Sequence, residues 1–423
     1  MITEQIQSLI NNGDFPKAAY LAKLNAIDAL QMAALLHSRA GDPHSIEIAK
    51  LCITLQPDSD KLYANLSFLL GNLMQCDEAI EAIDKAISMS QQPNVSYYRQ
   101  KAILLASLKR SKEAIEAYKL ILNINPDPHV LFNIGCHQML LGNYKEGLQL
   151  LENRLIYDQE LVDFVKRFNK PYWDGRDIKG KRLLIFSEQG SGDVIQFIRY
   201  LPKIKDVTLI GELQEELVPL VKDFFDITIG RSPDFNVTKP FTDTEYDYIV
   251  SFSSLSYLLD PELKDIPPCP YLFSDSRFKV DKTKFNVGIV WSGNPLHPND
   301  INRSCPPAYF TKLLQIENIQ LYNLQKGKKF EGTIDCQLSN FQDTTNVIQK
   351  LDLVISVDTA VAHLAGAMNK RVFLLLPYCH DHRWLLNNST SPWYPSMKIF
   401  HQKVAGDWGD VSWQVYEHTK PLG

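Results

Sequence analysis

A repeated pair of helices in the first third of this 423-residue chain most strongly constrains how it can fold. The segment DEAIEAIDKAI starts at Asp77 and returns as KEAIEAYKLIL at Lys112 and as KEGLQLLENRL at Lys145, at spacings of 35 and 33 residues. A helix pair of this length cannot bury its apolar face alone, so successive copies stack on one another. We therefore predict a helical solenoid of about four repeats over residues 1–160.

Such a solenoid has a concave surface that suits an extended peptide or a partner protein. The sequence leaves a second interpretation open, in which the repeats are a structural spacer or a dimerisation arm. Aromatic residues at repeat positions are expected to be core residues, and none is assigned to a site.

The pattern changes after residue 160, where short apolar runs alternate with helical segments. Pro171, Gly175 and Gly180 punctuate the junction, and a proline-rich link near residue 265 separates two similar halves. This alternation predicts parallel sheets covered by helices on both faces, with ligands beyond the carboxyl ends of the strands. The predicted fold class is thus α + α/β, a helical solenoid at 1–160 followed by Rossmann-like domains at 161–275 and 276–423.

The stretch KRLLIFSEQGSGDVIQFIRYL, from Lys181 to Leu201, predicts a buried strand, a glycine loop and a helix. We expect Gly190 and Gly192 to adopt backbone angles closed to other residues and to let a ligand approach the main chain. Asp193 stands at the expected helix start, with Gln196 on the polar side of the helix. Asp193 has two interpretations, a helix N-cap or a group that takes part in chemistry.

Three loops rich in hydrogen-bond donors follow predicted strands of the second half. They contain Gly293, Asn294, His297 and Arg303, then Lys326, and then Asp358, Thr359 and His363. Helix amides near Thr359 and the guanidinium of Arg303 suit a nucleotide diphosphate. Alternatively, His363 is a helix-face histidine, and Lys326 belongs to a solvated lysine loop. The segment HDHRW after another strand contains Asp381, His382, Arg383 and Trp384, which either contact donor or acceptor or form a structural turn.

Other classes of function are disfavoured by the whole sequence. There is no Walker loop or strict GxGxxG motif, and no motif or pair of acids convincingly placed to hold a metal. The net charge is −5 with scattered Lys and Arg, which argues against nucleic acid as a partner. Seven widely spaced cysteines fit a reducing compartment. The chain also lacks a signal-peptide pattern and a run of 18 apolar residues, so we expect no transmembrane segment and a cytoplasmic location.

Taken together, these segments resemble a known layout. The helical repeat is similar to the tetratricopeptide repeat. EQGSGDVIQFIRYLP, VGIVWSGNPLHPNDINRSCPP and DLVISVDTAVAHLAGAM resemble bacterial tetratricopeptide-repeat proteins that carry a heptosyltransferase-like (glycosyltransferase family 9-like) domain. The layout is also similar to that of O-GlcNAc transferase. This resemblance implies a GT-B fold in which the C-terminal domain holds a nucleotide sugar, the N-terminal domain faces the acceptor, and no metal or other cofactor is bound.

The resemblance also implies roles for individual residues. Asp193 matches the aspartate thought to be the general base, and Arg303 matches a basic residue that contacts the donor diphosphate. Asp358, Thr359, Ala360 and His363 match the DTAxxH donor motif, and Lys326 is a weaker match near the nucleoside. Gly190, Gly192, Gln196, Gly293 and Asn294 are expected to support the site. The GSGD loop departs from the plainer loop of heptosyltransferases, so the donor sugar and the acceptor stay open.

The expected function is metal-independent, inverting transfer of a sugar from a nucleotide-diphosphate sugar to an acceptor hydroxyl, on a protein or surface glycan. The repeats are expected to bind the peptide or protein partner. A rival hypothesis is a non-catalytic repeat scaffold whose transferase-like domain binds a nucleotide sugar or nothing. A nucleotide-sugar epimerase of similar shape has no support from a repeat domain.

Overall fold

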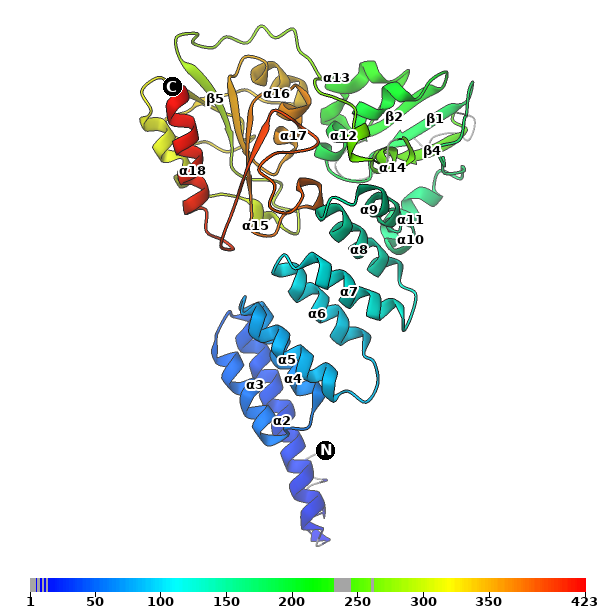
Figure 1. Ribbon diagram of the computed structural model, residues 1–423, viewed down its shortest axis with the longest axis vertical. Coiled ribbons are helices and arrows are strands. Elements are labelled where there is room, and N and C mark those ends of the chain that lie inside the picture. Colours follow the sequence, from blue (N-terminus) through cyan, green and yellow to red (C-terminus); the bar gives the residue numbers. More distant parts are fainter. Residues whose placement is uncertain (1–4, 6–7, 10, 13, 232–244, 260–261) are drawn as a thin grey trace. The chain divides into compact units, whose positions relative to one another are not determined.

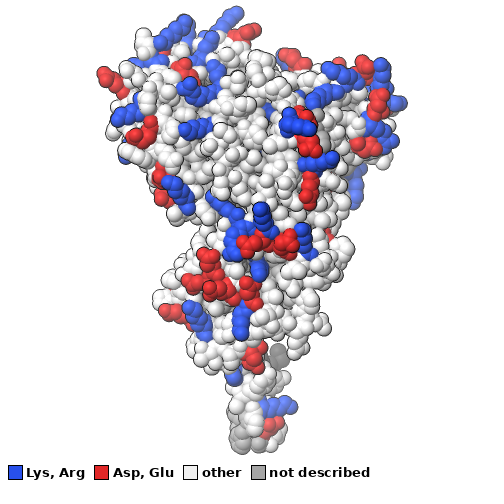
Figure 2. Space-filling model, in the orientation of Figure 1, with Lys and Arg blue, Asp and Glu red and all other residues white. Residues whose placement is uncertain are grey.

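The computed structural model describes residues 1–423 apart from 1–4, 6–7, 10, 13, 232–244 and 260–261 (Figure 1). Contacts within the chain divide it into two compact units, Met1–His137 and Gln138–Gly423. Among the described residues, no helix combines the length and the apolar character needed to cross a membrane. On the face drawn in Figure 2, Lys and Arg are mixed with Asp and Glu.

The first unit is built from successive helix pairs, as the repeat predicts. Its helices are α2 Phe15–Arg39, α3 His44–Leu55, α4 Asp60–Asn72, α5 Cys76–Met89, α6 Val95–Ser107, α7 Ser111–Leu122 and most of α8 Pro128–Leu140. Helices α4 and α5 pack together, as do α6 and α7. Ala79, Ala102 and Ala114 are fully buried. Small residues are needed at these positions, because a larger side chain would separate the paired helices. The first repeat is irregular, since α2 has 25 residues and the other helices have 12 to 14.

Short helices open the second unit before its first sheet. They are α9 Tyr144–Leu151, α10 Arg154–Tyr157 and α11 Gln159–Lys166. They contact the α/β part, since the Tyr144 ring of α9 lies 5.8 Å from that of Trp393. The end of α8 does so too, because the Leu386 amide donates to the Leu140 carbonyl at 2.9 Å. The domain boundaries at residues 160 and 275 stay predictions.

The first sheet is parallel, with strand order β3-β2-β1-β4. Its strands are β1 Arg182–Phe186, β2 Thr208–Gln214, β3 Ile227–Arg231 and β4 Tyr248–Ser251. After β1, the chain forms α12 Ser191–Phe197 and then the 3₁₀ helix η1 Ile198–Lys203, where a single longer helix was expected. Pro202 contributes to that difference, because it cannot donate to an α-helical hydrogen bond.

The second sheet is also parallel, with strand order β10-β9-β8-β5-β6-β7. Its strands are β5 Phe285–Val290, β6 Ile319–Asn323, β7 Ile334–Asp335, β8 Leu353–Val357, β9 Val372–Leu376 and β10 Met397–His401. Counted from β5, this is the 3-2-1-4-5-6 order of a Rossmann sheet, read from the other edge. The predicted fold class, helical repeats followed by two parallel α/β sheets, is therefore confirmed.

Some local predictions were wrong or incomplete. The segment after β5 that alternation of strands and helices predicts to be helical is the 3₁₀ helix η6 Pro307–Gln315, not an α-helix. Strands β7 and β10 and the helix α18 Gly409–Thr419 were not predicted, because β7 has two residues and β10 follows a long turn-rich segment.

Both sheets of the second unit share one apolar core. It joins Val194 and Ile198, which follow β1, to Ala362 and Leu364 of α17 Ala360–Ala367. Helices α12 and α17 pack against each other. The helix after the central strand of one sheet thus meets a helix of the other, and the loops before these helices come close together.

Candidate active site

The strand order places two predicted loops at a natural ligand-binding position. From β5 the chain continues to β6 on one side, and from β8 it continues to β9 on the other. Neighbouring strands whose connections diverge in this way leave a crevice at their carboxyl ends. The loop after β5 carries Arg303 and the loop after β8 carries Asp358.

Arg303 lies beside the N-terminus of α17. Its Nη1 donates to the carbonyl oxygen of Asp358 at 3.1 Å, and its Nε donates to Asp300 at 3.1 Å. Thr359 is the N-cap of α17 and Ala360 is the first helical residue, so the amides of the first turn are free of the helical ladder. A guanidinium and a helix N-terminus side by side favour an anionic group.

The site glycines act differently from the prediction. Gly190 has φ −70° and Gly192 does not have a positive φ, so the expectation that these two glycines adopt angles closed to other residues was wrong. Gly192 and Gly293 instead allow neighbouring protein groups to pack closely. A Cβ on Gly192 would lie 3.1 Å from the His363 ring, and one on Gly293 would lie 2.3 Å from Arg303 Nη2.

Asp193 is not a helix N-cap. Gly190 is the N-cap of α12, and Asp193 is the third residue of that helix. Its carboxylate accepts a hydrogen bond from Arg383 Nη2 at 2.8 Å. The cap interpretation was therefore wrong, and the side chain belongs to a contact between α12 and the segment after β9.

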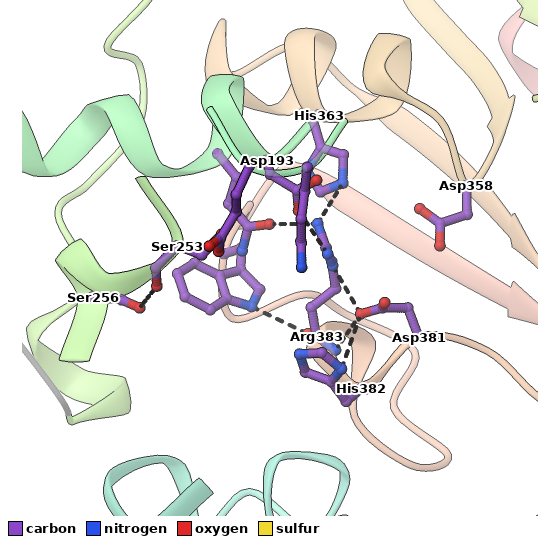
Figure 3. A network of polar contacts seen from close by, with 12 residues as sticks. Asp193, Ser253, Ser256, Asp358, His363, Asp381, His382 and Arg383 are labelled. Carbon is purple, nitrogen blue, oxygen red and sulfur yellow. Dashed lines mark hydrogen bonds and ion pairs between the residues drawn. The ribbon is translucent and has the colours of Figure 1, made fainter. Parts of the chain in front are cut away.

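Arg383 is the centre of this contact (Figure 3). Besides Asp193, its guanidinium bonds Asp381 through Nε at 2.8 Å and the Gln196 side-chain oxygen through Nη1 at 2.9 Å. Nη1 also lies 3.5 Å from His363 Nε2. The guanidinium thereby fixes two carboxylates, an amide and an imidazole relative to one another.

His363 is buried, and both of its ring nitrogens are engaged. Nδ1 lies 2.9 Å from the Tyr394 hydroxyl, and the ring stacks on Trp384 at 5.1 Å between centroids. Arginine can only donate, so Nε2 accepts and Nδ1 carries the proton. Burial and the Arg383 charge hold the pKa of His363 well below its usual value, so the ring is neutral near pH 7.

The carboxylates around Arg383 have different pKa values. Burial and the neighbouring Asp381 charge raise the pKa of Asp358 to about 6. Burial also opposes ionisation of Asp381, but the charges of Arg383 and His382 outweigh it and hold the pKa of Asp381 well below its usual value. Asp381 is therefore the permanent counter-ion of Arg383, and Asp358 is the carboxyl group that titrates near neutral pH.

The remaining predicted residues lie at the edge of this arrangement or apart from it. Asn294 is exposed and accepts from the Leu296 amide. Lys326 is also exposed, and its Nζ donates to the Ser339 carbonyl at 2.9 Å. The structure thus brings together Gly192, Asp193, Gln196 and His363 around Arg383, and Gly293, Arg303, Asp358, Thr359 and Ala360 around the start of α17.

The role of Arg383 could not be decided from the sequence. The sequence left open whether Arg383 and Asp381 contact a ligand or form a structural turn. In the structure Arg383 binds the Asp193 side chain and Asp381 binds Arg383. Their position after β9 was the available signal, since the other site loops also follow strands of that sheet. Tyr394 gave no such signal, because it comes from an irregular segment between β9 and β10.

Comparisons with known proteins agree with this architecture. A model of glycosyltransferase family 9 (heptosyltransferase) matches residues 315–402, which include Asp358, His363 and Arg383. A tetratricopeptide-repeat model matches residues 95–128.

Individual proteins are similar to all or part of the chain. Protein FlbA of Caulobacter vibrioides is 24% identical over 424 residues, covering 90% of this chain and 70% of that protein. Among solved structures, MamA is 21% identical with a TM-score of 0.30, over 37% of this chain and 96% of MamA. The iron-containing dodecameric glycosyltransferase TibC of enterotoxigenic E. coli H10407 is 16% identical with a TM-score of 0.39, over 56% of this chain and 67% of TibC. The chain therefore combines a match to the tetratricopeptide repeat with a match to glycosyltransferase family 9 (heptosyltransferase).

Proposed function

We propose that this protein is an inverting glycosyltransferase that moves a sugar from a nucleotide-diphosphate sugar to an acceptor hydroxyl without a metal ion. The observation that carries the proposal is the Rossmann switch point at which Arg303 lies beside the N-terminus of α17, within the unit that contains the family 9 match. These groups would bind the diphosphate of the donor and stabilise it as it leaves. They supply the positive charge that a metal ion provides in other transferases.

Asp193 is the general base of the proposed reaction. It takes the proton of the acceptor hydroxyl, the oxygen forms a bond to the anomeric carbon, and the bond from that carbon to the diphosphate oxygen breaks. The electron pair of the broken bond goes to the leaving diphosphate. Among the described residues, hydrogen bonds engage only Oδ1 of Asp193, so Oδ2 is left for the acceptor.

The repeat unit binds a peptide or protein, as acceptor or as partner. Support comes from a pocket of about 390 Å³ between α2, α3 and α4, lined by Met32 and Phe68, whose side chains are about half exposed or more. Exposed apolar residues around such a pocket are typical of a protein-binding surface.

A panel of nucleotide sugars tests the proposal. The protein should be stabilised against heat by one class of nucleotide diphosphate and should slowly hydrolyse the matching sugar donor. The rival scaffold hypothesis predicts no hydrolysis and no transfer, whether or not a nucleotide stabilises the protein. No stabilisation by any nucleotide diphosphate, together with no turnover, would contradict both the donor site and the activity.

A further inference from the structure

A buried arginine outside the site joins the helices that precede the first sheet to the loops at its carboxyl edge. Arg154, at the start of α10, is 5% exposed. Its Nε donates to Glu188 at 2.7 Å, and its Nη2 donates to the Ser254 hydroxyl at 2.8 Å. Its Nη1 bonds the carboxylate of Glu152. The guanidinium is thus held in three directions.

The partners of Arg154 come from the loops that shape the proposed acceptor side. Glu188 lies in the loop between β1 and α12, the loop that leads to Asp193. Ser254 ends the 3₁₀ helix η4 Phe252–Ser254, which follows β4. Strands β1 and β4 are neighbours in the sheet, so both loops leave the same carboxyl edge. One side chain therefore connects three segments that are distant in sequence.

Every polar group of this cluster is bound within it, apart from one carboxylate oxygen. The Ser254 hydroxyl donates to Glu152 Oε2 at 2.7 Å and lies 2.9 Å from the Tyr172 hydroxyl. The Glu188 side chain is 2% exposed, and its Oε2 has no partner among the described residues. Burial opposes the charge of Arg154, but Glu188 and Glu152 outweigh it and raise the pKa of Arg154.

An ion cluster of this kind does little for net stability, because desolvation of the charges offsets most of their attraction. Its hydrogen bonds are directional, however, and a planar guanidinium fixes the positions of its acceptors. The cluster therefore defines where the β1–α12 loop lies.

We propose that Arg154 is a positioning residue that holds the β1–α12 loop through Glu188, so that Asp193 is placed for transfer. This inference rests on the proposed function. It assigns the helices before the first sheet a part in building the acceptor side of the site.

Two substitutions in the full chain test the inference. Arg154→Lys keeps the charge but replaces the fork with a single ammonium group, which cannot hold three partners in one plane. Glu188→Gln keeps the shape and one acceptor oxygen but removes the charge from the loop. Arg176→Lys is the matched control, because Arg176 makes an ion pair of 2.8 Å with Asp174 on the exposed surface of the same unit.

Amide hydrogen exchange reports on the loop without requiring any activity. Exchange should increase severalfold in residues 187–196 of both variants and stay unchanged in residues 353–367, which belong to the donor side. Transfer to the acceptor should fall by about tenfold to a hundredfold, the effect of misplacing a catalytic group by about 1 Å. Donor affinity should remain within twofold, and Arg176→Lys should match the wild type in every measurement.

The outcomes separate this inference from the proposed function. If the wild type turns over no nucleotide sugar, the proposed function fails, while the exchange data still decide whether Arg154 orders the loop. If exchange of residues 187–196 is unchanged in both variants, the inference is wrong. Should Arg154→Lys fail to fold, Glu188→Gln gives the decisive result. A loosened loop with transfer at the wild-type rate would also overturn the positioning role.

Discussion

The guanidinium of Arg383 donates a hydrogen bond to the Asp193 carboxylate at 2.8 Å, across 190 residues of sequence. Asp193 belongs to the helix after the central strand of the first sheet, and Arg383 follows a strand of the second. The contact uses Oδ1 of Asp193 and fixes the orientation of the carboxylate, so that Oδ2 can face an acceptor. The proposed base is therefore held in place by the half of the unit that we propose binds the donor.

Replacing Arg383 with methionine should destabilise the protein. Asp193 and Asp381 would lose their shared partner while remaining largely buried, with side-chain exposures of 14% and 34%. We expect a loss of about 2 to 3 kcal/mol in the free energy of unfolding, below the 3–5 kcal/mol of a fully buried pair. Urea unfolding measures it. Arg176→Met removes an exposed pair and should cost less than about 1 kcal/mol. An equal decrease in the free energy of unfolding of the two variants would show that Arg383 does not hold this cluster together.

Asp358 should make stability depend on pH between about 4 and 6. Its pKa is about 6 in the folded protein against 3.8 for the free side chain. The folded state thus holds the proton more tightly, so stability is present below pH 4 and is lost as the pH rises through 6. Between pH 4 and pH 6, the free energy of unfolding of the wild type should fall by about 2 to 3 kcal/mol relative to that of Asp358→Asn. Unfolding curves of both proteins at pH 4, 5, 6 and 7 measure this difference. If the free energies of unfolding of the two proteins change equally with pH, Asp358 has an ordinary pKa.

Arg303→Ala should weaken nucleotide diphosphate binding by at least about tenfold, because one charge-assisted hydrogen bond contributes roughly 1.5–3 kcal/mol. Calorimetry with the free nucleotide measures the affinity. Lys403→Ala is the control, since Lys403 is exposed and pairs with Asp410. Unchanged affinity in Arg303→Ala would place the diphosphate elsewhere.

Removing residues 1–137 should separate donor chemistry from acceptor recognition. These residues form the first compact unit, and the described site residues all belong to the second. The shortened protein should bind and hydrolyse the donor as the full chain does, but it should lose transfer to its native acceptor. Full transfer in the shortened protein would show that the repeats are a spacer.

Sequence patterns predicted the repeats and most strands because both depend on local periodicity. The repeat spacing corresponds to the helix pairs in which Ala79, Ala102 and Ala114 are buried, and the run LLIF is a strand with four buried residues. The relation of Asp193 to Arg383 was beyond such reasoning, since it depends on how two sheets pack. The role of Gly192 also could not be predicted. A glycine is needed there because the His363 ring packs against it, and not because of an unusual backbone angle.

Substitution of Asp193 by asparagine tests the proposed mechanism most directly. Asparagine keeps an oxygen that accepts from Arg383 but cannot take a proton at neutral pH. General-base catalysis commonly contributes about a hundredfold to ten-thousandfold in rate. Asp206→Asn, at an exposed aspartate paired with Lys179, is the matched control. With saturating donor and acceptor, we predict that transfer by Asp193→Asn falls by at least about a hundredfold, while donor affinity stays within about twofold. Transfer within a few-fold of the wild type would contradict the account, and the search for the base would return to His297, His363 or Asp381.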